Sequence, residues 1–329
     1  MLKAMEKKDA AAKFDFKELL KQNGLVIAFI VMMIGFTLMS DRFLTYSNII
    51  TVIRQVSIYG IIACGMTYVI IGGNFDLSVG SLVSLVAVVV ISLHDTIGPL
   101  PAILVGLLVG LASGTFVGYL VGFLKLNSII ITLGMLGGLQ GLTLIYTGGA
   151  YSSISNPDAT WYSFIGRGFL GEIPFPIILY AAIIILFAVV LTKTVYGRQL
   201  KAVGGNSKAS QFTGIRSNLV VMSTFIASGV TAAIGAIVLS SRIMSAQNYI
   251  GEGYEFQVIT GVILGGTSLL GGEGSVLKTF LGIVILGFLR NGFILMGFPY
   301  YTTWIIQWFI IVGVVWIDVA SRRGGKILA

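Results

Sequence analysis

Charged residues are scarce in this chain. Asp, Glu, Lys and Arg make up only 10% of its 329 residues, whereas hydrophobic residues make up 56%. Soluble domains carry about 25% charged residues. A chain this apolar cannot hide its hydrophobic surface in one globular core, so the composition predicts an integral membrane protein.

The residues that most often carry catalysis or hold metals are also nearly absent. Cys64 is the only cysteine, which excludes an intrachain disulfide framework, and His94 is the only histidine. No His, Cys and carboxylate cluster has metal-ligand spacing, and the pair Gly325-Lys326 lacks the flanking Gly and Ser/Thr of a P-loop. We therefore expect no enzyme activity, metal or cofactor in this chain. A polytopic protein without catalysis most often moves a solute.

Apolar segments long enough to cross a bilayer recur along the chain. A hydrocarbon core of about 30 Å needs about 20 apolar residues per helix. The sequence predicts an all-α polytopic protein with about ten spans, near residues 24–40, 52–72, 77–93, 102–124, 128–147, 175–193, 218–240, 256–271, 276–297 and 301–318. Around this transmembrane domain (24–320) we expect an N-terminal tail (1–23) and a C-terminal tail (321–329).

The placement of basic residues orients these spans. With the N-terminus inside, sixteen Lys and Arg fall on the cytoplasmic side and only Arg42, Arg167 and Arg242 on the other. This asymmetry predicts that both termini are cytoplasmic. The formal net charge of +8 reflects the same placement rather than nucleic-acid binding, since no basic, aromatic-rich soluble domain is present.

The most distinctive polar segment is the basic loop 193–217. It carries five positive charges, Arg198 among them, and no negative one. A short helix is expected to stop at Gly204-Gly205, and Asn206 is a good N-cap for a second short helix that ends before Gly214. Two readings remain open from these residues alone: two small helices that dock a partner at the membrane surface, or an ordinary basic cytoplasmic loop.

A few polar residues near the spans are candidates for a solute pathway. Gly72-Gly73 is expected to break a helix, and Asp76 can cap the next one. A carboxylate at membrane depth is costly and therefore suggests function, although a helix cap at the inner interface explains Asp76 equally well. Asn74, Gln247 and Asn291 are further candidates.

Arg290 is expected in the outer half of the span 276–297. Its charge must face protein or water, or reach outward to the interface. Glu252 or Glu255 can pair with it, and we favour such a structural ion pair over a contact with substrate.

Three stretches carry a family pattern. The first is GMTYVIIGGNFDLSVGS (65–81), and the third is VILGGTSLLGGEGSVLKTFLGIVILGFLRNG (262–292). The second is the basic loop, where Gly197-Arg198, Gly204-Gly205-Asn206, Ala209 and Gly214-Ile215 stand at the family's spacing. Together they resemble the permease subunits of ABC importers for simple sugars, of the ribose/xylose/arabinose/galactose type.

The resemblance implies a cobalamin-importer-like permease fold in a bacterial inner or plasma membrane. It implies an importer built from two permease chains, by default a homodimer, with two cytoplasmic ATPase domains and an extracytoplasmic solute-binding protein. ATP and Mg would bind the partner ATPase. A ribose-like pentose or a hexose would pass between the permease chains, and loop 193–217 would dock on the ATPase. The residues implied in docking are Arg198, Gly204, Gly205, Asn206, Ala209 and Gly214.

Two departures from the family pattern leave the solute open. Asn127-Ser128 begins the fifth span where a Pro-x-Phe-Ile-like start is usual, and Arg290 stands where a second Asn commonly precedes Asn291. The alternative is a stand-alone, ion-coupled secondary transporter of a small polar solute, with Asp76 as its coupling group. A receptor or scaffold that holds a signalling partner on the basic loop is a third hypothesis.

Overall fold

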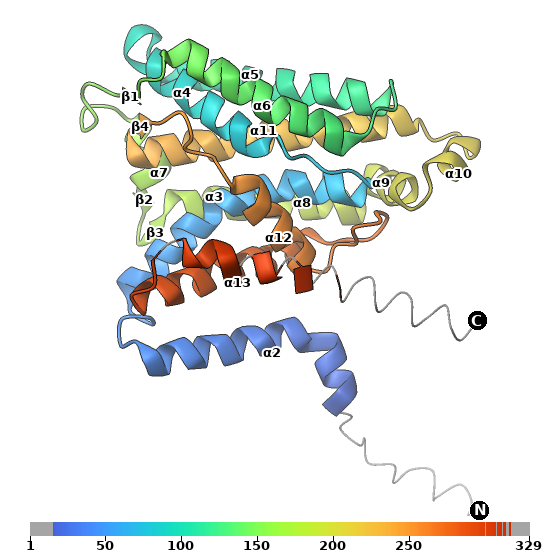
Figure 1. Ribbon diagram of the computed structural model, residues 1–329, viewed down its shortest axis with the longest axis horizontal. Helices are drawn as coiled ribbons and strands as arrows, with labels where there is room; N and C mark the ends of the chain where they lie inside the picture. The colour runs from blue at the N-terminus through green and yellow to red at the C-terminus, as the bar shows by residue number, and fades with distance from the viewer. Residues whose placement is uncertain (1–15, 300, 307, 311, 314–315, 317–329) are drawn as a thin grey trace, which may run out of the picture.

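Long apolar helices lie side by side along one direction in the computed structural model (Figure 1). The structure describes residues 16–299, 301–306, 308–310, 312–313 and 316. The predicted tail 321–329 and residues 1–15 of the predicted tail 1–23 lie outside these residues. The helices are α2 (Phe16–Met39), α3 (Tyr46–Ile71), α4 (Val79–Ile97), α5 (Pro99–Gly122), α6 (Ser128–Thr147), α7 (Tyr162–Arg167), α8 (Phe175–Lys193), α9 (Val195–Gly205), α10 (Ser207–Phe212), α11 (Ser217–Ile243), α12 (Tyr254–Leu264) and α13 (Val276–Leu295).

Seven helices of the described part are long and apolar enough to cross a membrane: α3, α4, α5, α6, α8, α11 and α13. They coincide with seven of the predicted spans. The apolar part of α2, Gly24–Met39, and α12 are shorter apolar helices. The predicted span 301–318 is described only in part, with helical residues at 302–306, 308–310, 312–313 and 316.

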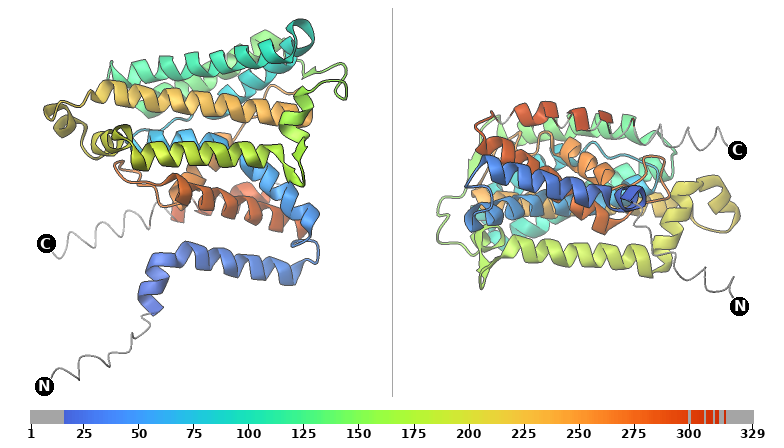
Figure 2. Two further views of the ribbon diagram at one scale, coloured as in Figure 1. Left: turned by 180° about the vertical axis from the view of Figure 1, so that it is seen from behind. Right: turned by 90° about the horizontal axis from the view of Figure 1, so that it is seen from below.

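The bundle has two different ends. One end, here called the α9 end, carries α9 and α10, which project beyond the long helices (Figure 2). The other, the α7 end, carries α7 and four two-residue strands. Strand β1 (Ser152–Ser153) pairs antiparallel with β4 (Ser245–Ala246), and β2 (Phe169–Leu170) pairs antiparallel with β3 (Ile173–Pro174).

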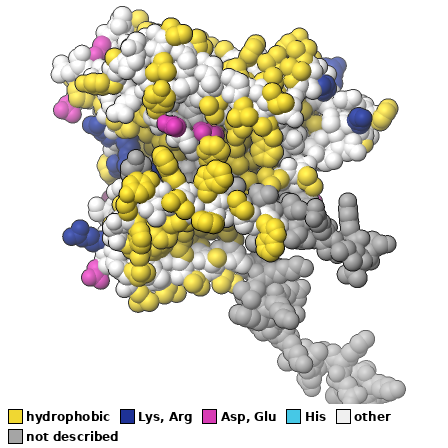
Figure 3. All heavy atoms as spheres, viewed as in Figure 1, with side chains coloured by type: hydrophobic (Ala, Val, Ile, Leu, Met, Phe, Trp, Pro, Cys, Tyr) yellow, Lys and Arg dark blue, Asp and Glu magenta, His cyan; other side chains and the backbone are white. Residues whose placement is uncertain are grey.

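Helix α3 lies at the centre, and every residue from Val56 to Ile71 is buried. Helix α2 runs along one edge of the bundle (Figure 2), where Phe36 packs edge-on against Phe293 of α13 at 5.5 Å between ring centroids. Apolar side chains cover most of the face seen in Figure 3, and its Lys and Arg side chains lie toward the two margins. This distribution suits a protein whose sides face hydrocarbon and whose ends face water.

Helices α5 and α11 pack through a glycine seam, defined here as Gly110, Gly114, Gly118 and Gly122. Each of these glycines lies directly against the backbone of α11: a Cβ on Gly110 would lie 2.5 Å from the Gly229 carbonyl oxygen, and one on Gly122 would lie 2.6 Å from that of Asn218. Small residues at four-residue spacing allow such close helix contact in a membrane, where van der Waals packing rather than water exclusion holds helices together.

Two segments turn back into the bundle before a helix begins. Residues 72–78 return from the α9 end, and Asp76 reaches Ser228 of α11 before α4 starts at Val79. Residues 247–253 return from the α7 end, so that α12 starts in the middle (Figure 1). The segment 247–253 meets the first turns of α4, which continues the segment 72–78, where the Gly251 amide donates to the Ser84 hydroxyl at 2.9 Å.

The predicted full span 256–271 is therefore wrong in its extent. Helix α12 has only 11 residues and ends at Leu264, where Gly265 packs directly against the Lys278 carbonyl. Glycines 266, 271 and 272 then have φ near +80°, a region that non-glycine residues avoid. The apolar run 256–271 thus consists of a half-length helix and the start of a glycine-rich loop.

Candidate functional site

The two short helices predicted in the basic loop are confirmed. The Thr194 hydroxyl accepts a hydrogen bond from the Gly197 amide at the start of α9, and the Asn206 side chain accepts one from the Ala209 amide at 2.9 Å at the start of α10. Gly214 follows α10 with φ +83°. Local capping chemistry explains why this sequence forms two ordered helices rather than a flexible linker.

One face of α9 is fixed to the long helices. Gly197, Leu200 and Val203 are buried, and the hydroxyls of Tyr196 and Ser223 of α11 share a hydrogen bond of 2.8 Å. Burial raises the pKa of the Tyr196 phenol above its ordinary value, although the bond to Ser223 lowers it in part, so this contact stays neutral. Helix α9 is therefore positioned rigidly on the bundle.

The opposite face of the loop is open. Five of the six predicted docking residues are exposed: Arg198, Gly205, Asn206, Ala209 and Gly214. The sequence analysis missed Phe212, which is 93% exposed at the end of α10. The signal that could have identified Phe212 from the sequence is an aromatic side chain inside a basic polar loop. The sixth predicted residue, Gly204, points instead into the bundle.

Gly204 belongs to a glycine junction, defined here as Gly73, Gly204, Gly205, Gly271 and Gly272. Three chain segments meet there: the turn after α3, the end of α9 and the loop before α13. The Gly272 amide donates to the Ile71 carbonyl at 2.8 Å. A Cβ on Gly271 would lie 2.7 Å from the Gly204 carbonyl oxygen, and one on Gly272 would lie 3.0 Å from the Gly205 Cα. The three stretches that carry the family pattern thus converge on one site.

Of the two alternatives left open for Asp76, the helix cap is wrong. Ser78 holds the N-cap position of α4. The Asp76 carboxylate is 3% exposed and accepts three hydrogen bonds: from the Ser78 amide at 3.1 Å, from the Ser78 hydroxyl at 2.6 Å and from the Ser228 hydroxyl at 2.7 Å. It joins the segment 72–78 to the middle of α11.

We expect Asp76→Ala to lower the free energy of unfolding by about 3 kcal/mol or more, because hydrogen bonds to a charged group contribute about 1.5–3 kcal/mol each. Asp76→Asn can keep the bonds of one oxygen, and the Ser228 hydroxyl can accept from the new amide, so it should stay within about 1 kcal/mol. Thermal melting of both variants in detergent checks this. Normal melting of Asp76→Asn combined with lost uptake would show instead that the charge itself is required, as the secondary-transporter alternative demands.

The four predicted pathway residues do not form one site. The Asn74 amide donates to the Gly72 carbonyl at 3.0 Å, near the α9 end. Asn291 exchanges two hydrogen bonds of 2.8 Å with Asn48, near the opposite end of α3. The 24 residues from Asn48 to Gly72 span about 36 Å of helix. Gln247 is exposed in the loop at the α7 end.

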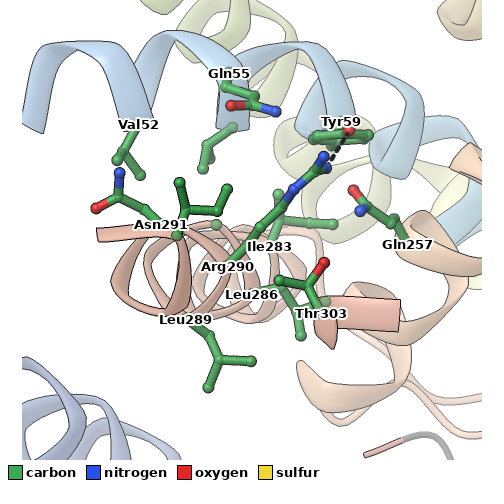
Figure 4. A pocket seen from close by; sticks show the side chains of 13 residues that line it. Val52, Gln55, Tyr59, Gln257, Ile283, Leu286, Leu289, Arg290, Asn291 and Thr303 are labelled. Carbon is green, nitrogen blue, oxygen red and sulfur yellow. Dashed lines mark hydrogen bonds between the residues drawn. The ribbon is translucent and has the colours of Figure 1, made fainter. Parts of the chain in front are cut away.

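A pocket lies where α3, α12, α13 and Thr303 meet (Figure 4). Arg290 stands in its middle and donates to the Tyr59 hydroxyl at 3.1 Å, and the side chains of Gln55 and Gln257 point toward it. The pocket is lined by Val52, Gln55, Val56, Tyr59, Gln257, Ile283, Leu286, Gly287, Leu289, Arg290, Asn291, Ile294 and Thr303. Mostly apolar walls with a few converging polar groups are typical of small-molecule sites.

The predicted ion pair of Arg290 is wrong. Within the residues that the structure describes, no carboxylate oxygen lies within 4.0 Å of an Arg290 nitrogen. Glu255 accepts hydrogen bonds from the backbone amides at the start of its own helix, and Glu252 is exposed. Of the pocket's polar residues, the sequence analysis singled out only Asn291 and Arg290. Tyr59 and Gln257 resembled ordinary span residues, since only the fold brings them together.

The fold and these sites define a helical membrane permease. Residues 48–315 match the family described as "Branched-chain amino acid transport system / permease component". The ribose import permease protein RbsC of Bacillus subtilis (strain 168) is 35% identical over 308 residues, which cover 93% of this chain and 95% of the relative.

Two further relatives are similar to this chain over more than nine-tenths of its length. RbsC of Escherichia coli (strain K12) is 34% identical over 302 residues, covering 91% of this chain and 94% of the relative. The L-arabinose transport system permease protein AraH of the same strain is 32% identical over 321 residues, covering 96% and 95%. No solved structure matches the chain. The chain belongs to this family of ABC-importer permeases, whose members are transport components. It is a multi-pass protein of the bacterial inner membrane.

Proposed function

We propose that this chain is the membrane-spanning permease subunit of an ABC importer that carries a monosaccharide, a ribose-like pentose or a hexose, into the cell. The observation that carries the proposal is the identity of 32–35% with ribose and arabinose import permeases over more than nine-tenths of the chain. The chain itself binds neither ATP nor Mg, and a separate ATPase subunit hydrolyses ATP.

The complete permease has about ten spans in a cobalamin-importer-like fold, with both termini in the cytoplasm. The domain 24–320 then includes the apolar part of α2 (Gly24–Met39), α12 and the stretch 301–318 besides the seven long helices. The tails 1–23 and 321–329 and the α9 end face the cytoplasm. The excess of Lys and Arg predicted on that side supports this orientation.

The ATPase docks on α9 and α10. Arg198, Gly205, Asn206, Ala209 and Gly214 lie on an exposed surface, to which Arg198 contributes a positive charge. The exposed ring of Phe212 is suited to fill an apolar pocket of the partner, as buried aromatic anchors do in many interfaces. Gly204 acts on the inner side, where the glycine junction joins α9 to α3 and to the loop before α13.

Transport follows from movement of the docked helices. ATP closes the ATPase dimer, α9 and α10 shift with it, and the glycine junction passes this shift to α3 and to the segment 72–78. The solute reaches the permease from an extracytoplasmic solute-binding protein at the α7 end. It then crosses between two copies of the permease, which form a homodimer.

A gentle detergent pull-down of the tagged chain from its native membrane tests this function. Mass spectrometry should find a stoichiometric ATPase subunit, and the reconstituted complex should take up solute only with ATP. A lone permease that remains stable through the same purification, and uptake that is lost when the proton gradient collapses while ATP stays high, would favour a secondary transporter instead.

A further inference from the structure

The pocket around Arg290 combines hydrogen-bonding groups with a charge. Two amide side chains, Gln55 and Gln257, and the Tyr59 hydroxyl surround the guanidinium (Figure 4). Amides and hydroxyls can both donate and accept, which matches the hydroxyls of a sugar. A neutral sugar needs no guanidinium, however, so Arg290 calls for its own explanation.

Positive charge accumulates around this pocket without acidic partners. Arg54 and Arg242 lie near enough to repel each other, and both Arg242 and Arg290 act electrostatically on Tyr254. The Nε atoms of Arg54 and Arg290 are buried and have no hydrogen-bond partner. Arg54 lies over the Phe169 ring at 4.9 Å from its centroid, which compensates only part of its charge. Within the described residues, none of these three arginines has a carboxylate oxygen within 4.0 Å of its nitrogens.

Arg54 and Arg290 lie below the rim of the α7 end. Arg54 follows the first residue of α3 by eight positions, about 12 Å of helix, and Arg290 precedes the last residue of α13 by five, about 8 Å. A flat protein surface docked on the rim does not reach this depth, whereas a small solute does. The Arg290 guanidinium is half-buried, its Nε atom has no hydrogen-bond partner, and within the described residues no carboxylate balances its charge. Such an uncompensated charge is costly, and an anion that enters the pocket reduces that cost.

We propose that the pocket is a solute site for an anionic monosaccharide, that is, a sugar that carries a carboxylate or a phosphate. This proposal rests on the proposed function and adds the charge of the substrate to it. Arg290 binds the anionic group with its forked donors, and Gln55, Gln257 and Tyr59 bind sugar hydroxyls. The positive charges of Arg54 and Arg242 add a favourable electrostatic potential for the anionic group.

The test compares matched neutral and anionic sugars in proteoliposomes that contain the complete importer with its ATPase and solute-binding protein. The labelled probes are D-ribose, D-ribonate and D-ribose 5-phosphate, and D-galactose, D-galacturonate and D-galactose 6-phosphate. At least one anionic probe should be taken up about tenfold faster than its neutral counterpart, and whether it is the carboxylate or the phosphate identifies the group. Arg290→Gln should abolish that tenfold preference, and Arg290→Lys should restore part of it.

Arg42→Gln is the matched control, because Arg42 is an exposed arginine in the turn before α3. It should leave uptake within about twofold of wild type. ATP-dependent uptake of neutral sugars alone, unchanged in Arg290→Gln, would overturn the proposal and leave the proposed function standing. Loss of the solute-binding protein from Arg290→Gln complexes, with all uptake reduced equally, would also overturn it, since Arg290 would then contact a protein partner.

Discussion

Gly114→Ala in the glycine seam should lower the free energy of unfolding by about 1–3 kcal/mol, the usual cost of inserting a methyl group into a close-packed interface. The added Cβ would lie 3.0 Å from the Ile226 Cα and closer still to the Phe225 carbonyl oxygen. Because these are backbone atoms, they cannot rotate away, and α5 must separate from α11. We expect a thermal midpoint in detergent about 2–5 °C below that of wild type.

Gly138→Ala provides the matched control in the neighbouring span. Gly138 also lies within a long apolar helix, α6, but nothing lies within 4 Å of its added Cβ. Its midpoint should be unchanged or slightly higher, because alanine favours helix over glycine. If both variants melt with wild type, the close packing of α5 on α11 does not contribute to stability as argued.

Gly204→Ala should separate ATP hydrolysis from transport. Its Cβ would overlap the Ile71 carbonyl oxygen and lie 2.7 Å from the Gly272 amide nitrogen, the two groups that hydrogen-bond to each other in the glycine junction. The methyl group must therefore displace α9 from α3. We expect uptake by the reconstituted importer to fall at least about tenfold, which corresponds to about 1.4 kcal/mol, while the ATPase keeps hydrolysing ATP.

Gly205→Ala, at the next position, tests whether the effect comes from this contact. Nothing lies within 4 Å of a Cβ on Gly205, so this variant leaves the contact with Ile71 and Gly272 intact, and any loss of uptake that it causes reports on docking at the open face. The membrane part should elute and melt normally in both variants, since α9 lies at the end of the bundle. Equal losses in the two variants would show that the open face, rather than the junction, limits coupling.

The basic loop could be predicted from sequence because its structure is local. The stop at Gly204-Gly205 and the cap at Asn206 depend on residues within one or two helical turns, and the structure places both as expected. The packing of Gly204 against the bundle, rather than on the open face of the loop, could not be predicted. It depends on Ile71 and Gly272, which are far away in the chain and meet it only in the folded bundle.

The half-length helix α12 escaped prediction because hydropathy does not distinguish a full span from a short helix followed by an apolar, glycine-rich loop. The run 256–271 is apolar enough for a full span, yet α12 ends at Leu264. The predicted ion pair of Arg290 with Glu252 or Glu255 was wrong for a related reason. Glu252 and Glu255 are the nearest acidic candidates in the loop sequence, but Glu255 is turned to the amides of its own helix and Tyr59 of α3 takes the hydrogen bond.

The contact between the first turns of α4 and the segment 247–253 has a mechanical consequence. Gly80 and Gly251 bring backbone against backbone with no side chain between them, and Ser84 bonds the Gly251 amide. Neither α4 nor the segment 247–253 can therefore slide without the other. Helix α4 is joined to the glycine junction by the segment 72–78, and the segment 247–253 returns from the α7 end. This contact therefore couples the two ends of the bundle. We therefore expect a displacement of the glycine junction to reach the α7 end through this contact.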